Sequence, residues 1–178
     1  MQDTELLNLA TRMGFNAAFA EVADIVQDPS FRKFCEENRC GNYNANYSCP
    51  PDCGSVREVQ DRLKSGKRAL VLQSVWDIGS FENKTAVQES KKTHNAAMLQ
   101  FMSALRQAGH RGFGLGYGGC PLCTPCKRVT NEPCAHPDKN LSCMSAYCID
   151  VAKLAQKCSL PFDWASDRLF LFGMFVFV

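Results

Sequence analysis

The clearest hydrophobic pattern in the chain runs through residues 84–108, where apolar side chains recur at spacings of three and four. This spacing matches the 3.6-residue repeat of an α-helix and produces one apolar face. The residues of this face are His94, Ala97, Met98, Phe101 and Leu105. Asn83 can cap the start of this helix and Gly109 can end it, so the pattern predicts a helix over 84–108.

Three other runs have the pattern of β-strands. Residues 69–76 and residues 169–178 are continuous apolar runs with β-branched or aromatic members, as in strands buried on both faces. Residues 111–117 alternate glycine with large side chains, which leaves one face of that strand bare. The connection between 69–76 and 111–117 is long enough for a parallel, right-handed crossover.

Shorter patterns predict helices around this sheet. Residues 6–13 indicate one helix, and Ser55 with Glu58 has the form of a capping box that starts another. A last helix is expected to carry Tyr147, Val151, Leu154, Ala155 and Cys158 on one face. Residues 15–27 are apolar but fit a strand or a helix equally well. The elements together predict an α/β fold: a mixed sheet of about four strands flanked by helices.

Composition adds the class of protein to this picture. A chain of 178 residues that is 46% hydrophobic and 21% charged has the balance of a globular protein. We therefore expect a single domain over residues 1–178, with two cysteine-rich segments, 35–53 and 120–148, as loops at one end of the sheet.

Cysteine is the exceptional component, with 11 residues in the chain. No secretory signal pattern opens the sequence, and an odd number of cysteines argues against a disulfide framework. The apolar tail 169–178 is roughly half the length of a membrane span. The net charge of +2 shows no basic stripe for nucleic acid. We expect a cytoplasmic protein, with no membrane or nucleic-acid partner, whose cysteines bind metal.

The second segment carries the stronger metal-binding signal. Cys120, Cys123 and Cys126 follow one another at three-residue steps, and Cys134 comes eight residues after Cys126. Bacterial ferredoxin loops use the same triple spacing to hold a 4Fe–4S cluster, with a fourth cysteine from further along the chain. Zinc sites more often pair two separate C-x-x-C turns. The spacing therefore favours a 4Fe–4S cluster, with zinc as the alternative.

The first segment contains Cys35, Cys40, Cys49 and Cys53, with spacings that match neither a zinc finger nor a ferredoxin. Four thiols within so short a segment predict a second metal site all the same. Cys49 is followed by proline, as is the last cysteine of a ferredoxin loop, which serves the other cluster. The pattern fits either one cluster or two, with ligands exchanged between the segments. It also fits buried thiols that bind no metal.

Three cysteines and one histidine are left over. Cys143 is expected at the N-terminus of the last helix, where the helix dipole favours a thiolate, so it fits a replacement ligand, a reactive thiol or a packing residue. Cys158 fits the apolar face of that helix, and Cys148 has no assigned role. His136 fits a ligand, a proton donor or a loop hydrogen bond.

The chain resembles the cysteine-rich predicted metal-binding proteins of domain-of-unknown-function family 2284. The motifs that carry the resemblance are Arg32…Cys35, Asn38-Arg39-Cys40-Gly41-Asn42-Tyr43, Cys49-Pro50-Pro51, Gly118-Gly119-Cys120-x-x-Cys123-x-x-Cys126, Pro133-Cys134-x-x-Pro137 and Ser145-Ala146-Tyr147-x-Ile149-Asp150-Val151. They span nearly the whole chain. The resemblance implies metal binding in an intact single domain, and a source among anaerobic bacteria and archaea; it implies no particular substrate.

Three functions fit these residues, and no catalytic residue is identified. The first is a redox protein that passes single electrons from 4Fe–4S clusters to partner enzymes. The second is an enzyme with an open iron that acts as a Lewis acid on a small-molecule substrate, in sulfur transfer or desulfuration; the bare glycine face and the spare thiol of Cys143 would suit it. The third is a zinc-binding interaction module. Two all-cysteine clusters would change the net charge from +2 to about −2.

Overall fold

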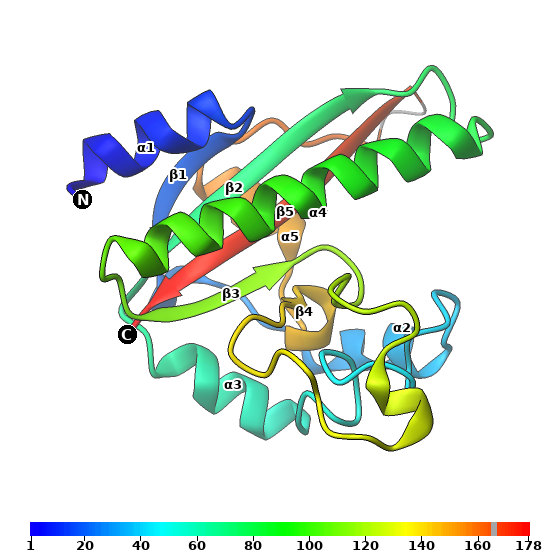
Figure 1. The fold of residues 1–178 in the computed structure, drawn as a ribbon. Helices are drawn as coiled ribbons and strands as arrows, with labels where there is room; N and C mark the ends of the chain where they lie inside the picture. The colour runs from blue at the N-terminus through cyan, green and yellow to red at the C-terminus, as the bar shows by residue number, and fades with distance from the viewer. Residues whose placement is uncertain (165–166) are drawn as a thin grey trace.

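The computed structural model describes residues 1–164 and 167–178, and its centre is a mixed β-sheet (Figure 1). Within this described part the sheet has five strands in the order β1-β2-β5-β3-β4. They are β1 (Asn16–Glu21), β2 (Arg68–Asp77), β3 (Gly112–Gly116), β4 (Ser142–Cys143) and β5 (Arg168–Phe177). The predicted α/β class is confirmed, with one strand more than expected.

Five α-helices and four short 3₁₀ turns are found in the described residues. The helices are α1 (Asp3–Arg12), α2 (Arg32–Glu36), α3 (Val56–Lys64), α4 (Lys84–Gln107) and α5 (Val151–Lys157). The 3₁₀ turns are η1 (Val22–Asp24), η2 (Pro29–Phe31), η3 (Lys127–Thr130) and η4 (Ser145–Tyr147).

The sheet lies between two layers of helices because its central strands are apolar on both faces. Leu70 and Leu72 of β2 pack in a core with residues of α1 and α4. Their neighbours Ala69 and Val71 point to the opposite face, where α3 and α5 cover the sheet. A continuous apolar run therefore predicted a doubly covered strand correctly.

The long strands and the long helix follow the predicted boundaries closely. β2 pairs antiparallel with β5 over its whole length, from Arg68 opposite Phe177 to Asp77 opposite Arg168. α4 begins after Asn83, whose side chain accepts a hydrogen bond from the Ala86 amide at 3.2 Å. β2 and β3 run in the same direction, as the long connection predicts, but β5 lies between them and pairs antiparallel with each.

The last helix is shorter than the apolar pattern predicts. Tyr147 belongs to η4, and Cys148 then adopts a left-handed backbone conformation (φ 57°) that interrupts the helix. α5 begins only at Val151, where the Asp150 side chain caps it by accepting from the Lys153 amide. Cys143 lies in β4, so the expectation that it starts a helix is wrong, and the helix dipole does not act on it.

The region of residues 15–27 resolves into β1 followed by η1. β1 pairs with β2 in an antiparallel register from Asn16 opposite Gln73 to Glu21 opposite Arg68. Sheet pairing thus decides between the two structures that the local pattern allowed.

The glycine face of β3 is covered, contrary to the expectation of a bare surface. A Cβ atom added at Gly114 would lie 2.6 Å from Leu141 Cδ2 and 2.9 Å from Met102 Sδ. The glycine lets α4 and the 141 segment pack directly against the strand backbone. This face therefore offers no space for a substrate.

Candidate metal centre

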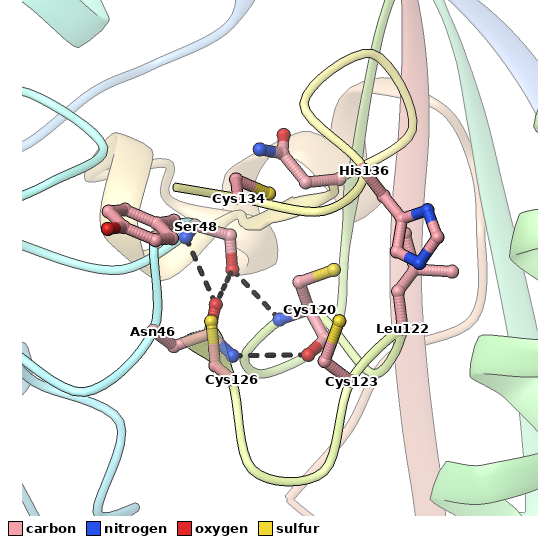
Figure 2. Close-up of a pocket in the computed structure, with 10 residues that line it drawn as sticks. Asn46, Ser48, Cys120, Leu122, Cys123, Cys126, Cys134 and His136 are labelled. Atoms are coloured by element: carbon pink, nitrogen blue, oxygen red, sulfur yellow. Dashed lines mark hydrogen bonds between the residues drawn. The ribbon is translucent and has the colours of Figure 1, made fainter. Parts of the chain in front are cut away.

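The segment that follows β3 brings four thiols around one cavity. Cys120, Cys123, Cys126 and Cys134 all line it, together with Asn46, Tyr47 and Ser48 of the first cysteine segment. Figure 2 shows the four sulfur atoms around the cavity, with the side chains of Asn46 and Ser48 among them. The four residues that the ferredoxin-like spacing groups are therefore together in space.

The first segment holds this loop by hydrogen bonds to Cys120. The Cys120 amide donates to Ser48 Oγ at 2.8 Å, and Asn46 Nδ2 donates to the Cys120 carbonyl at 3.1 Å (Figure 2). The Ser48 hydroxyl in turn donates to Asn46 Oδ1 at 2.8 Å. Asn46 and Ser48 are both buried, and the bonds that they make to Cys120 are partly shielded from water.

Gly119 allows the close approach that these bonds need. A Cβ atom at this position would lie 2.7 Å from Asn42 Oδ1 and 3.0 Å from Asn46 Nδ2. A larger residue would push the loop away from the first segment, which explains the glycine immediately before Cys120.

An arginine on the outer side joins the same two segments a second time. Arg128 of η3 donates through Nε to Asp52 at 2.8 Å and through Nη2 to Asn44 at 2.6 Å. It also holds Asn131 of its own loop at 2.6 Å. The sequence pattern carries no signal for Arg128, Asn46 or Ser48, because each acts only across the fold.

Burial keeps the unliganded thiol of Cys120 protonated. It raises the pKa of Cys120, while backbone hydrogen bonds from Leu122 and Leu141 act in the opposite direction. A metal must displace this proton, and the same amide donors then stabilise the thiolate.

His136 lies at the exposed rim of this cavity with Leu122 and Asn140. Its carbonyl accepts hydrogen bonds from the amides of Lys139 and Asn140 and so closes the turn after Cys134. These backbone bonds give the segment its shape, and they need no particular side chain at position 136.

A second cavity collects three cysteines of the first segment. Cys35, Cys40 and Cys49 line it, and the fourth thiol on its wall is that of Cys143 from β4. Burial raises the pKa of Cys49 to about 12, against the opposing effect of its hydrogen bond with Ser48. The pKa of Cys35 is also raised, first by its hydrogen bond with the thiol of Cys143 and then by burial.

Three other cysteines line neither cavity. Cys53, which the sequence groups with the first segment, is 5% exposed and packs in the core beside α3. Cys148 is fully buried, and Cys158 follows α5 and packs against the same core, as its position on the apolar face predicts.

A single metal ion and a cluster make different demands on these thiols. In the part of the chain that the structure describes, no three His, Cys, Asp or Glu side chains converge closely enough to hold one metal ion. A 4Fe–4S cluster makes a different demand, because each of its four thiolates binds a separate iron. Four thiols around a cavity, with amide donors beside the sulfur of Cys120, fit that demand.

The fold and the thiol-lined cavities define a cysteine-rich α/β protein. The model of the family described as "predicted metal-binding protein (DUF2284)" matches residues 18–177, and the chain belongs to this family. No curated protein and no solved structure matches the chain.

None of the helices in the described ranges 1–164 and 167–178 has the length and apolar character needed to cross a membrane.

Proposed function

We propose that the protein binds a 4Fe–4S cluster through Cys120, Cys123, Cys126 and Cys134 and transfers single electrons to redox enzymes in an anaerobic, cytoplasmic metabolism. The observation that supports this most is that these four thiols share one cavity and also have the spacing of a ferredoxin loop. Family membership supports metal binding in general.

The bound cluster would supply one-electron chemistry, and the chain's own residues would hold it and limit its exposure. This chemistry would need a reduced donor protein and an oxidised partner enzyme, and it would exchange no bond or proton. Asn46 and Ser48 cover one side of the cavity and hold the Cys120 backbone. Amide donors near Cys120 Sγ would stabilise the added negative charge.

The electron-transfer partner would approach the open side of the loop. Pro121, Thr124 and Pro125, which separate the cysteines, are exposed, whereas Asn46 and Ser48 are buried. Electron transfer needs a short path, so we expect the redox partner to dock on residues 121–125.

Anaerobic purification followed by metal analysis tests the proposal. We expect brown protein that contains at least about four irons and four sulfides per chain and is reduced reversibly by one electron at this site. Cys123→Ser should remove about four irons, because one corner of this cluster loses its thiolate. Cys158→Ser is the matched control and should keep them, since Cys158 lines neither thiol cavity. Colourless protein with stoichiometric zinc would contradict both cluster hypotheses and leave the zinc-binding module as the remaining candidate.

A second candidate function, catalysis at an open iron, is favoured by one observation. A cavity of about 390 Å³ lies beside the thiols of the first segment, and its lining includes Arg32, Glu36 and Ser55. Tyr43 and Pro50 line both this cavity and the second thiol cavity. The volume of about 390 Å³ suits a small-molecule substrate. A cluster spectrum that responds to small thiols or anions, without reversible reduction, would favour this enzyme over electron transfer.

A further inference from the structure

The second thiol cavity combines cysteines from both segments of the chain. Cys35, Cys40 and Cys49 come from the first segment, and Cys143 is brought to them by the edge strand β4. β4 is held in place because it pairs in parallel with β3, with Cys143 opposite Gly116. The wall of this cavity thus has four thiols, like the wall of the first.

Cys143 is better placed than Cys53 to complete this set. Its thiol lines the same cavity as that of Cys35, and the Ala146 amide donates to Cys143 Sγ at 3.3 Å. Amide donors of this kind stabilise cluster thiolates. The thiol of Cys53 instead contacts the carbonyl of Gly54 at 3.9 Å, inside the apolar core.

A buried cation beside this cavity needs a negative partner. Arg32 is 8% exposed, and its guanidinium donates to the carbonyls of Gly54 at 3.0 Å and Ala146 at 2.9 Å. Its Nε has no hydrogen-bond partner, and no carboxylate pairs with it among the residues that the structure describes. A buried unpaired charge is strongly unfavourable. Arg32 and Cys35 lie one turn apart on α2, so thiolates near Cys35 would provide the missing counter-charge.

The two thiol cavities share a wall. Ser48 lines the first cavity and the next residue, Cys49, lines the second; Gly119 lines the second and Cys120 the first. Ser48 Oγ lies 4.0 Å from Cys49 Sγ and accepts from the Cys120 amide at 2.8 Å. One side chain therefore links a thiol of one cavity to the backbone of a proposed ligand of the other.

We propose that Cys35, Cys40, Cys49 and Cys143 bind a second 4Fe–4S cluster, and that Ser48 connects it to the first. This inference rests on the proposed function for the identity of the metal. One electron moves between the two sites, one core being oxidised from 1+ to 2+ and the other reduced from 2+ to 1+, with no bond or proton transferred. The protein is then an electron carrier with two coupled sites, in which each cysteine segment positions the other's cluster.

Metal analysis of single-cysteine variants after anaerobic reconstitution tests the ligand set. We expect about eight irons and eight sulfides per chain in the unchanged protein and about four in Cys143→Ala. Cys53→Ala is the matched control and should retain about eight. Cys40→Ala should behave as Cys143→Ala does, and because Cys40 is exposed its loss does not threaten the fold.

The electron paramagnetic resonance spectrum of the fully reduced protein tests the connection. Two reduced clusters in adjoining cavities should give a broadened, spin-coupled signal, which Cys143→Ala and Cys123→Ser should each convert to a simple single-cluster signal.

The failures are distinguishable. About four irons in the unchanged protein, lost in Cys123→Ser but not in Cys143→Ala, would overturn this inference and leave the proposed function standing. Loss of iron in Cys53→Ala but not in Cys143→Ala would also overturn it, with Cys53 as the ligand. Absence of iron from all variants and from the unchanged protein would overturn the proposed function itself.

Discussion

The half of the molecule formed by the sheet and its long helices differs in kind from the half that carries the thiol cavities. The first half has strands of ten residues in β2 and β5 and a helix of 24 residues in α4, all packed through apolar side chains. The second half, residues 32–54 and 117–148, contains only short elements, of which α2 is the longest with five residues.

Different interactions hold the two halves. Apolar burial stabilises the sheet half. The stabilising free energy is roughly proportional to the apolar area removed from water and depends little on individual contacts. The thiol half depends on single polar contacts, such as those of Ser48, Arg32 and Arg128. Metal binding would add to these contacts, since a site absent from the unfolded chain contributes its binding energy to folding. The sheet half can therefore fold from its local hydrophobic pattern, whereas the thiol half depends on specific polar contacts within the chain.

The largest expected effect concerns the sheet half and its buried histidine. His94 hydrogen-bonds through Nδ1 to Ser74 Oγ at 2.7 Å, and burial lowers its pKa to about 4. The unfolded chain, with a histidine pKa near 6.5, binds the proton first, so stability is highest above pH 6.5 and falls as the pH drops towards 4. The full loss should be about 3 kcal/mol.

Urea unfolding of the metal-free protein at pH 7.5 and pH 5 measures about 2 kcal/mol of this loss, because the pKa of His94 in the folded protein is still below pH 5. His94→Gln should remove most of the difference, with a smaller part left from His110, whose pKa burial also lowers. His136→Gln is the control and should keep the full difference, because His136 is exposed. An unchanged pH dependence in His94→Gln would contradict the assignment.

The next effect concerns the contact between the two cysteine segments. Gly119→Ala should lower the stability by about 2 kcal/mol, since its new methyl group overlaps Asn42 and Asn46. Iron content should fall at both sites, because the segments share this wall. Gly116→Ala is the control: its Cβ would lie no closer than 3.4 Å to Leu141, an ordinary contact. Full iron content in Gly119→Ala would show that the two segments bind metal independently.

The smallest expected effect tests the coupling between the two metal sites separately from the stability of the protein. Ser48→Ala leaves the Cys120 amide without its acceptor and should lower stability by about 1 kcal/mol. We expect nearly full iron content but a weaker spin coupling between the reduced clusters. Ser65→Ala, on the exposed end of α3, is the control for both readouts. Unchanged coupling in Ser48→Ala would mean that Ser48 does not connect the clusters and that electrons pass through other residues of the wall shared by the two cavities.

The parts of the fold that the sequence predicted well are those that local pattern decides. The apolar runs at 69–76 and 169–178 became β2 and β5 within one residue at each end, and the repeat over 84–108 became α4. The capping box of Ser55 and Glu58 starts α3. In each case the signal and the structure involve the same neighbouring residues.

The parts that could not be predicted involve residues far apart in the sequence. β4 has only two residues and exists because β3 pairs with it, so no periodicity could indicate it. The left-handed backbone of Cys148 interrupts a helical apolar pattern that looked continuous. The glycine face of β3 looked open because the residues that cover it, Met102 and Leu141, lie elsewhere in the chain.

The sequence by itself therefore determined the α/β class, the long elements and the grouping of Cys120, Cys123, Cys126 and Cys134. Each of these features depends on the spacing of residues that are close together in the sequence. Only the tertiary structure decided that Cys143, and not Cys53, shares a cavity with Cys35, Cys40 and Cys49. Local spacing brings thiols together only within one loop. A thiol set that spans two segments depends on sheet pairing and on the contacts of Ser48, Gly119 and Arg32, which form when the chain is folded.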